Sequence, residues 1–249
     1  MEIQEFFTNY PRVAVAFSGG ADSSYLLWEA VRCGVDVRAY YVSSVFQPAF
    51  ELEDARRLAE EVGAPMEILS ADVLADPVIA SNPPDRCYHC KQRIFGEILR
   101  AAERDGYPVV LDGTNASDDA GDRPGMRALK ELQVLSPLRL CGLTKAEIRK
   151  RSKEAGLFTW DKPAYACLAT RVPSGQAITP EILQRTERAE RFLAEKGFSD
   201  FRVRLRGNAA LLQVPADQMA RVQDCREDIL AELGKMYDEV LLDLKARGE

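Results

Sequence analysis

The sequence predicts an α/β fold, a parallel and doubly wound sheet followed by a small α+β C-terminal domain. Apolar runs at residues 13–17, 35–42 and 66–69 alternate with segments of helical periodicity. Strands that alternate with helices in this way form right-handed crossovers and therefore a parallel sheet. Towards the end of the chain, short strands with alternating polarity follow one another closely, which is typical of a small separate sheet. We therefore expect two domains, residues 1–175 and 176–249.

The composition is that of an ordinary globular protein. Of the 249 residues, 46% are hydrophobic, which is ample for a packed core. The net charge of −6 argues against a broad nucleic-acid surface, because contact with many phosphates requires a basic face. There is no basic leader with a long apolar run, and no apolar segment is long enough to span a bilayer. We expect a cytoplasmic protein with reduced cysteines and without nucleic-acid or membrane partners.

The first apolar run ends in the sequence Ser-Gly-Gly-Ala-Asp-Ser and opens onto a helix. A strand, a tight glycine turn and a helix N-terminus together form a site for anions, because glycine permits close backbone approach and the first helical N–H groups are free. The spacing is neither that of a Walker A loop nor that of a dinucleotide fingerprint. An ordinary capped turn is the alternative reading. We expect this turn to bind the phosphates of a nucleotide through Ser18, Gly19, Gly20 and Ser23.

The middle of the chain continues the alternation after an interruption by two prolines. After residues 81–91, a helix is expected through Ile94, Phe95, Ile98 and Leu99, and a further strand over 109–115 with a polar tip. Asp118, Asp119 and Asp122 follow in a loop, where they either hold Mg²⁺ or remain solvated.

Two further elements precede the expected domain boundary. Residues 135–138 are expected to form a short strand. Thr144 and Glu147 form a capping box that begins a helix, which should run to about Ala155.

The C-terminal part is expected to contain two helices and three strands. A helix begins after Thr179 with Pro180 at its first position. The remaining elements are strands over 201–206 and 210–214, a helix over 217–233 and a strand over 239–244.

Three arginines share one face of the first of these strands. Alternation places Arg202, Arg204 and Arg206 on one side, and Val203 and Leu205 on the other. An exposed strand protected from edge pairing by charge is one interpretation. A cluster that binds a phosphate or carboxylate is the other, and we favour it because guanidinium groups offer bidentate donors and the chain as a whole is acidic.

Two stretches carry cysteines of interest. Cys87 and Cys90, with His89 between them, could be half of a zinc site, a redox pair or two packed thiols. We favour packing, because a zinc site would need two further ligands. Cys167 lies in an irregular stretch bounded by proline and glycine. A small core residue is the plain reading of Cys167, whereas Lys162 and Arg171 nearby would favour a reactive thiolate.

These motifs resemble known enzymes. The glycine turn resembles the PP-loop of N-type ATP pyrophosphatases, which split ATP between the α- and β-phosphates. The resemblance becomes specific to the LarE family through several motifs in the same order along the chain. They are residues 18–23, 82–91, 112–115, 123–125, 160–163 and 166–171.

The resemblance implies a fold of the adenine nucleotide alpha-hydrolase (PP-loop, HUP-like) type and an ATP-dependent sulfur transferase. Such an enzyme adenylates a carboxylate of pyridinium-3,5-biscarboxylic acid mononucleotide and then transfers sulfur, in biosynthesis of the nickel-pincer nucleotide cofactor. Cys167 matches the sacrificial cysteine of the family, which loses its sulfur and becomes dehydroalanine. Some members use an iron–sulfur cluster instead, but no other cysteine lies between residues 142 and 224.

The resemblance also assigns roles to other residues. It implies ATP and Mg²⁺ as cofactors and a trimer-based hexamer. The chain departs from the family at Gln213, where a glutamate is frequent. An amide is a weaker metal ligand than a carboxylate, so this departure counts against the metal site that the resemblance implies in the C-terminal part. The implied contacts are Ser18, Gly19, Gly20, Asp22, Ser23, Val42, Thr114 and Arg171 for ATP, Arg202 and Arg204 for the substrate phosphate, and Glu190 and Asp217 for a metal.

Other functions remain open at this point. PP-loops of this kind also serve tRNA thiolation and amidating synthetases. Against the first stands the acidic balance, and against the second stands the lack of a glutaminase region. A nucleotide-sensing protein without turnover is a third possibility, and pyrophosphate release would distinguish it from an enzyme.

Overall fold

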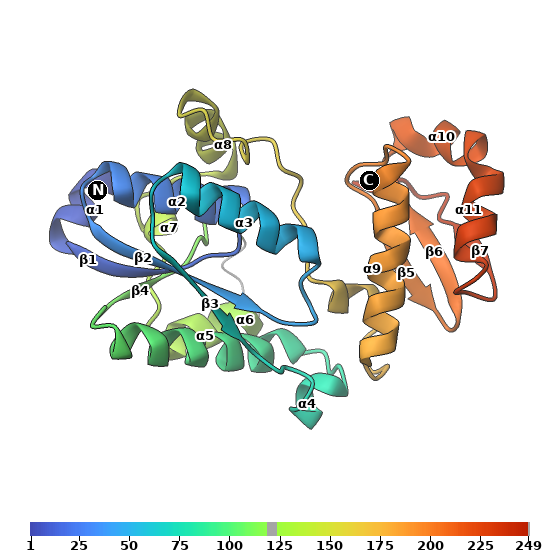
Figure 1. The fold of residues 1–249 in the computed structure, drawn as a ribbon, viewed down its shortest axis with the longest axis horizontal. Helices are drawn as coiled ribbons and strands as arrows, with labels where there is room; N and C mark the ends of the chain where they lie inside the picture. The colour runs from blue at the N-terminus through green and yellow to red at the C-terminus, as the bar shows by residue number, and fades with distance from the viewer. Residues whose placement is uncertain (119–123, 249) are drawn as a thin grey trace. The chain divides into compact units, whose positions relative to one another are not determined.

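The computed structural model describes residues 1–118 and 124–248, in two compact units (Figure 1). One unit comprises Met1–Ile79 and Asp85–Lys162, and the other Ala80–Pro84 and Pro163–Glu249. Residues 163–175 thus group with the C-terminal part, whereas the expected division after residue 175 stays a prediction. In the described ranges, no helix is long and apolar enough to cross a membrane.

The N-terminal unit is built on a four-stranded parallel sheet, as the sequence predicted. The strand order is β3-β2-β1-β4, so the first strand lies inside the sheet and is buried on both faces. Parallel strands covered on both sides are continuous apolar runs, which is why this pattern is visible in the sequence. The strands are β1 (Arg12–Ala16), β2 (Asp36–Ser43), β3 (Met66–Ser70) and β4 (Val110–Leu111).

Helices cover both faces of this sheet (Figure 1). Helices α2 (Ala21–Arg32) and α3 (Ala49–Glu61) lie on one face, and α5 (Arg86–Arg104) lies on the other. The core between sheet and helices includes Val13, Val15, Leu26, Leu27 and Leu58, all fully buried. The shorter helices of this region are α1 (Ile3–Asn9), α4 (Pro77–Ala80), α6 (Pro124–Glu131), α7 (Pro137–Leu140) and α8 (Lys145–Glu154).

The expected strand over residues 135–138 is wrong. Leu135 forms only an isolated parallel bridge with Leu111, and the chain then turns into α7. The physical reason is Pro137, which has no N–H for a strand ladder and fits the first position of a helix. Asp119 and Asp122 lie outside the described residues.

The capping box at Thr144 is confirmed. The Thr144 hydroxyl accepts a hydrogen bond from the backbone N–H of Glu147, at a distance of 3.3 Å, and α8 begins at the next residue, Lys145. This cap satisfies one of the free N–H groups of the helix and fixes where its first side chains lie.

The C-terminal unit packs α9 (Pro180–Glu195) against a three-stranded sheet. The sheet has the order β5-β6-β7, with an antiparallel β5–β6 pair and a parallel β6–β7 pair. Its core includes Leu193, Val203, Leu205, Leu212 and Leu233. The strands are β5 (Arg202–Arg206), β6 (Ala209–Gln213) and β7 (Val240–Leu242).

Two details of this unit differ from the expectation. The single helix expected over 217–233 is interrupted at Cys225, where the backbone leaves helical geometry. A short 3₁₀ turn, η1 (Leu168–Arg171), follows Cys167 and was not foreseen. The pieces around Cys225 are η2 (Ala216–Gln218), α10 (Met219–Asp224) and α11 (Arg226–Leu233).

Candidate active site

The glycine turn after β1 is held in shape by its own serines. The hydroxyls of Ser18 and Ser23 lie 3.1 Å apart, and the Ser23 hydroxyl donates to the carbonyl of Gly20 at 3.2 Å. Gly19 has a φ of 71°, and a Cβ there would lie 3.1 Å from the Cβ of Ala55. Both backbone conformation and space therefore require glycine, which leaves the N-terminus of α2 open for an anion.

Asp22, in the first turn of α2, is held by a lysine from a distant part of the chain. The Nζ of Lys145 lies 2.6 Å from Oδ2 of Asp22. The other carboxylate oxygen, Oδ1, is buried and has no hydrogen-bond partner among the residues that the structure describes. A buried carboxylate oxygen without a partner is costly unless a ligand satisfies it. Its chemistry fits Mg²⁺, which prefers carboxylate oxygens next to phosphates.

Lys162 also contacts the glycine turn. Its Nζ donates to the carbonyl of Gly19 at 3.2 Å and lies 2.7 Å from Oδ2 of Asp54 on α3. The two lysines, 145 and 162, therefore bring positive charge to the turn where phosphates are expected. The expected influence of Lys162 on Cys167 stays a prediction.

The other expected ATP residues of this unit surround the carboxyl ends of the strands. Val42 lines a mainly apolar pocket together with Phe17, Tyr41 and Phe95, and this pocket also reaches Ser18. An apolar pocket beside a phosphate turn has the chemistry that an adenine base requires. Thr114 donates from its hydroxyl to Asp112.

Two residues of this site were not singled out from the sequence. Lys145 was read only as part of a capping box, and Gly113 only as part of a polar strand tip and of the family motif 112–115. A Cβ on Gly113 would lie 2.9 Å from the backbone nitrogen of Ser23, so the loop after β4 packs directly on the start of α2. The Asp-Gly pair at the end of a strand was the available signal for this close approach.

Cys167 lies in the C-terminal unit, immediately before the 3₁₀ turn. Its side chain is half-buried and forms no disulfide. Its carbonyl accepts hydrogen bonds from the backbone N–H and from the hydroxyl of Thr170, at 2.9 and 2.8 Å. The thiol therefore stands on an ordered backbone turn, and it is not the fully buried core residue of the plain reading.

Arg171 is one of the most deeply buried side chains of the chain, with 1% of its surface exposed. Its Nε and Nη2 donate to the two carboxylate oxygens of Glu190, at 2.8 and 2.9 Å. Its Nη1 donates to the carbonyl of Ala166 at 2.7 Å and to the hydroxyl of Thr170 at 2.9 Å. These bonds engage all three guanidinium nitrogens, so the structure gives no support to the expected contact of Arg171 with ATP.

Both carboxylate oxygens of Glu190 are likewise occupied by protein donors. Its Oε1 also accepts from the backbone N–H of Val203 at 2.9 Å, and its Oε2 accepts from the hydroxyl of Tyr165 at 2.5 Å. Burial, and then the charge of Glu190, raise the pKa of Tyr165, so this hydroxyl remains protonated and donates.

The expected metal site does not fit this arrangement. Both oxygens of Glu190 are occupied by protein donors, and Asp217 is exposed on η2. Within the described part of the chain, no group of three or more His, Cys, Asp or Glu side chains is placed to hold a metal ion. Gln213 accepts a hydrogen bond from Nε of Arg204 at 2.6 Å and donates to Asp243 at 2.8 Å. The assignment of Glu190 and Asp217 as metal ligands is therefore not supported.

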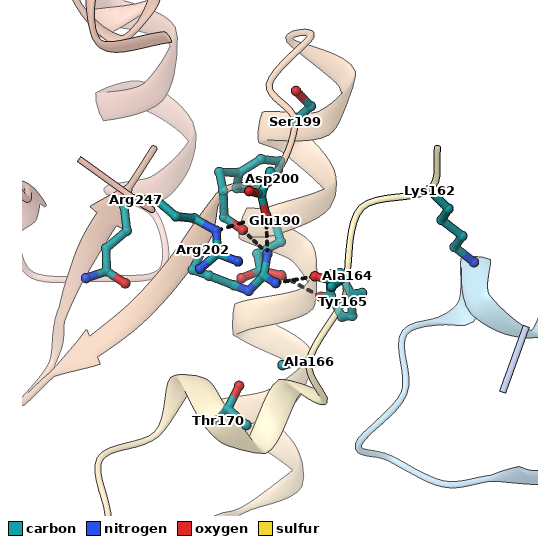
Figure 2. Close-up of polar contacts among 12 residues, drawn as sticks. Lys162, Ala164, Tyr165, Ala166, Thr170, Glu190, Ser199, Asp200, Arg202 and Arg247 are labelled. Carbon is teal, nitrogen blue, oxygen red and sulfur yellow. Dashed lines mark hydrogen bonds and ion pairs between the residues drawn. The ribbon is translucent and has the colours of Figure 1, made fainter. Parts of the chain in front are cut away.

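Arg202 and Arg204 lie on the face of β5 opposite the core residues Val203 and Leu205. Figure 2 shows Arg202 beside Ala164 and Tyr165 of the segment before Cys167. Arg202 is 5% exposed and donates to the carbonyls of Phe201 and Ala164, each at 2.6 Å. Burial lowers the pKa of Arg202 to about 10, and the positive charges of Arg171 and Arg247 act in the same direction.

Arg204 is half-buried, and its Nη1 donates to the carbonyl of Thr170 at 2.8 Å. Burial lowers its pKa too, followed by the charges of Arg171 and Arg247. Arg206, by contrast, is exposed. The reading of an exposed, charge-protected strand thus suits Arg206 alone.

The arginine cluster, formed by Arg202, Arg204 and Arg247, carries more positive charge than its acidic neighbour Asp200 can balance. Arg247 pairs with Asp200 at 2.9 Å, while Arg202 lies 3.8 Å from the same carboxylate. Arg204 instead has an amide and a carbonyl as partners. Such a group of partly buried guanidiniums favours an anionic ligand, and phosphate matches its donor geometry.

The Cys87–Cys90 pair lies at the start of α5 and is not a buried pair. Cys87 is exposed and Cys90 is half-buried, so the expectation of packing is wrong for Cys87. Its position on the outer side of the helix is the reason. Nη2 of Arg86 lies 3.7 Å from the Cys87 sulfur, and His89 pairs with Asp85 at 3.3 Å.

The parallel sheet and the Ser-Gly-Gly-x-Asp-Ser turn at the start of α2 define a PP-loop protein, a class whose enzymes use ATP. No family model matches the chain. It is 34% identical over 215 residues to the pyridinium-3,5-bisthiocarboxylic acid mononucleotide synthase of Lactiplantibacillus plantarum, covering 86% of this chain and 77% of that enzyme. The chain belongs to the family of this synthase, the LarE family.

Two further relatives show how far along the chain the similarity extends. An uncharacterized protein of Synechocystis sp. is 38% identical over 224 residues, covering 89% of this chain and 84% of that protein. The tRNA-specific 2-thiouridylase MnmA of Frankia alni is 28% identical over 187 residues, covering 61% of this chain and 53% of that enzyme. The similarity to the thiouridylase is thus limited to a part of each chain.

Proposed function

We propose that this protein is an ATP-dependent sulfur transferase that acts on pyridinium-3,5-biscarboxylic acid mononucleotide in biosynthesis of the nickel-pincer nucleotide cofactor. It adenylates a carboxylate of this substrate and converts it to a thiocarboxylate with the sulfur of Cys167. The observation that carries the proposal is the attachment of the cysteine turn, residues 164–171, to strand β5, which carries Arg202 and Arg204. Arg202 and Arg204 both donate to backbone carbonyls of that turn, so a nucleophile and an anion site are joined.

The N-terminal unit carries the adenylation step. ATP phosphates bind to the N–H groups of the glycine turn, with Ser18 and Ser23 as further donors and Val42 and Thr114 at the strand ends. Asp22 is the residue that would hold Mg²⁺, which supplies charge neutralisation for phosphates when bound. The substrate carboxylate attacks the α-phosphate, the bond to the β-phosphate breaks, and pyrophosphate leaves.

The C-terminal unit carries sulfur transfer. The thiolate of Cys167 attacks the adenylated carbonyl carbon, a C–S bond forms, and AMP leaves with the electron pair of the broken C–O bond. Loss of the Cα proton of Cys167 and cleavage of its Cβ–S bond then give dehydroalanine and a substrate thiocarboxylate. Arg202 and Arg204 bind the substrate phosphate during both steps. Each chain therefore acts once.

Intact-protein mass spectrometry after incubation with ATP, Mg²⁺ and the dicarboxylate mononucleotide tests this proposal. The protein mass should fall by the mass of one H₂S, with the loss located at residue 167, and pyrophosphate should appear in the solution. Pyrophosphate release over many turnovers, with an unchanged Cys167 and thiocarboxylate product, would contradict the sacrificial mechanism.

Thiolation of tRNA is the second candidate, because MnmA enzymes are among the relatives. The acidic balance of the chain argues against it, since tRNA binding requires a basic surface. Retention of tRNA by this protein at physiological salt would favour that alternative. The trimer-based hexamer and the cytoplasmic location remain predictions.

A further inference from the structure

The backbone around Cys167 is held by arginines on both sides of the thiol. Three carbonyls of this segment each accept a hydrogen bond from a different guanidinium. The pairs are Ala164 with Arg202 at 2.6 Å, Ala166 with Arg171 at 2.7 Å, and Thr170 with Arg204 at 2.8 Å. Two of these arginines belong to β5 and the third belongs to the cysteine turn itself.

Arg171 differs from the other two because it is joined to a carboxylate that reaches β5. Glu190 accepts two bonds from Arg171, and its Oε1 also accepts from the backbone N–H of Val203. Val203 lies between Arg202 and Arg204 on the strand. The ion pair thus forms a continuous link from the carbonyl before Cys167 to the part of β5 that carries Arg202 and Arg204.

The link is more specific than packing requires. A buried ion pair of this kind contributes little net stability compared with apolar side chains of similar volume. The same pair, however, fixes direction, because the guanidinium is planar and its donors have a set geometry. Tyr165 adds a fourth bond to the carboxylate and restrains it further.

We propose that Arg171 and Glu190 are positioning residues, which hold the Cys167 thiol at a fixed place relative to the anion site on β5. The proposal rests on the proposed function. It replaces the roles of ATP ligand and metal ligand that sequence resemblance suggested for these two residues. Sulfur transfer depends on the pair, whereas adenylation does not.

The test uses a double variant, because removal of one partner alone would leave a buried charge unpaired and strongly destabilise the fold. Arg171→Met with Glu190→Leu replaces both partners by apolar side chains. The matched control is Arg188→Met with Glu232→Leu, an ion pair of 2.5 Å that also begins on α9 but is solvent-exposed at its arginine. Arg171→Lys is the conservative variant, because it keeps the charge and loses the planar fork.

Three quantities are measured in the full-length protein: the apparent KM for ATP in a single turnover of pyrophosphate release, the thiocarboxylate formed per pyrophosphate, and hydrogen exchange of the amides of residues 165–170. For the double variant we expect an unchanged KM, a fall of about tenfold or more in thiocarboxylate per pyrophosphate, and faster exchange of these amides. The control pair should match the wild type in all three. Arg171→Lys should give a yield of thiocarboxylate per pyrophosphate between those of the double variant and the wild type.

Two results would overturn the proposal. A KM for ATP raised about tenfold, with an unchanged yield of thiocarboxylate per pyrophosphate, would make Arg171 an ATP ligand. Unchanged values of all three quantities would make the pair a packing feature only. If the wild-type protein releases no pyrophosphate, the proposed function fails, and the exchange comparison, which requires no ATP, still decides whether the pair fixes the turn.

Discussion

Lys145 and Asp22 form an ion pair of 2.6 Å between residues that lie far apart in sequence, and this pair brings the capped start of α8 against the start of α2. The pair leaves Oδ1 of Asp22 buried without a partner among the described residues. The ammonium group of Lys145 balances the carboxylate of Asp22 in the absence of ATP. It also lies beside the glycine turn, where the phosphates of ATP are expected to bind.

Replacement of Lys145 by methionine should therefore impair adenylation. We expect pyrophosphate release to fall by about 10- to 100-fold, because a charge-assisted contact to a phosphate contributes roughly 1.5–3 kcal/mol. Lys150→Met, at an exposed position of the same helix, is the control and should behave as the wild type. Equal rates for both variants would exclude Lys145 from the ATP site.

Asp22→Asn and Ser18→Ala should abolish or greatly reduce pyrophosphate release while the fold remains. Asp22 is the residue proposed for Mg²⁺, and the Ser18 hydroxyl supports the glycine turn through Ser23. Circular dichroism and a thermal unfolding curve would verify the fold, and a coupled pyrophosphate assay would measure the rate. Undiminished release in either variant would show that the glycine turn is not the ATP site.

Asp217→Ala should leave the Mg²⁺ dependence of the reaction unchanged. Asp217 is exposed on η2, and Glu190 has no oxygen left for a metal beside it. Titration of activity with Mg²⁺ after treatment with EDTA would give the same midpoint as in the wild type. A midpoint shifted about tenfold to higher Mg²⁺ would restore the metal role that family resemblance implies.

The sequence was sufficient for the four strands of the N-terminal sheet and for the glycine turn, because local patterns determine both, although it also predicted a strand over 135–138 that the structure does not contain. Strand β1 is a continuous apolar run, and the turn is a contiguous motif. The ion pair of Lys145 with Asp22 was not predictable, since 123 residues separate the partners and the local sequence explains Lys145 fully as part of a helix start.

The arginine face shows a second limit of sequence reasoning. Alternation correctly separated Arg202 and Arg204 from Val203, but could not say which face is covered. The cysteine turn folds over the arginine face, and its carbonyls accept from both arginines. The burial of Arg171 and the engagement of Glu190 likewise depend on the packing of α9, which a motif does not contain.

Arg202→Ala and Arg204→Ala should weaken the mononucleotide substrate far more than ATP. Each removes a guanidinium from a cluster with excess positive charge, and Arg206→Ala, on the same strand but exposed, is the control. Isothermal titration with the dicarboxylate mononucleotide and with ATP would separate the two affinities. A loss of ATP affinity with retained substrate affinity would show that β5 has been assigned to the wrong ligand.

Cys167→Ser distinguishes a sacrificial cysteine from a packing residue. Attack on an acyl adenylate requires a thiolate, and an unperturbed thiol with a pKa of about 8.5 is only slightly ionised near pH 7. A serine hydroxyl at the same place ionises far less and carries no sulfur. The variant should therefore release pyrophosphate and retain the substrate as its acyl adenylate, but form no thiocarboxylate.

The wild-type protein should make at most one thiocarboxylate per chain, because the sulfur leaves with the product. Peptide mapping should find dehydroalanine at residue 167 and the other five cysteines intact, among them the exposed Cys87, which serves as an internal control for non-specific loss of sulfur. Yields above one per chain, with sulfide supplied and Cys167 unchanged, would transfer the sulfur source to an external donor. Because adenylation is assigned to the glycine turn of the other unit, that result would leave the ATP chemistry in place and would reduce Cys167 to a carrier or a structural residue.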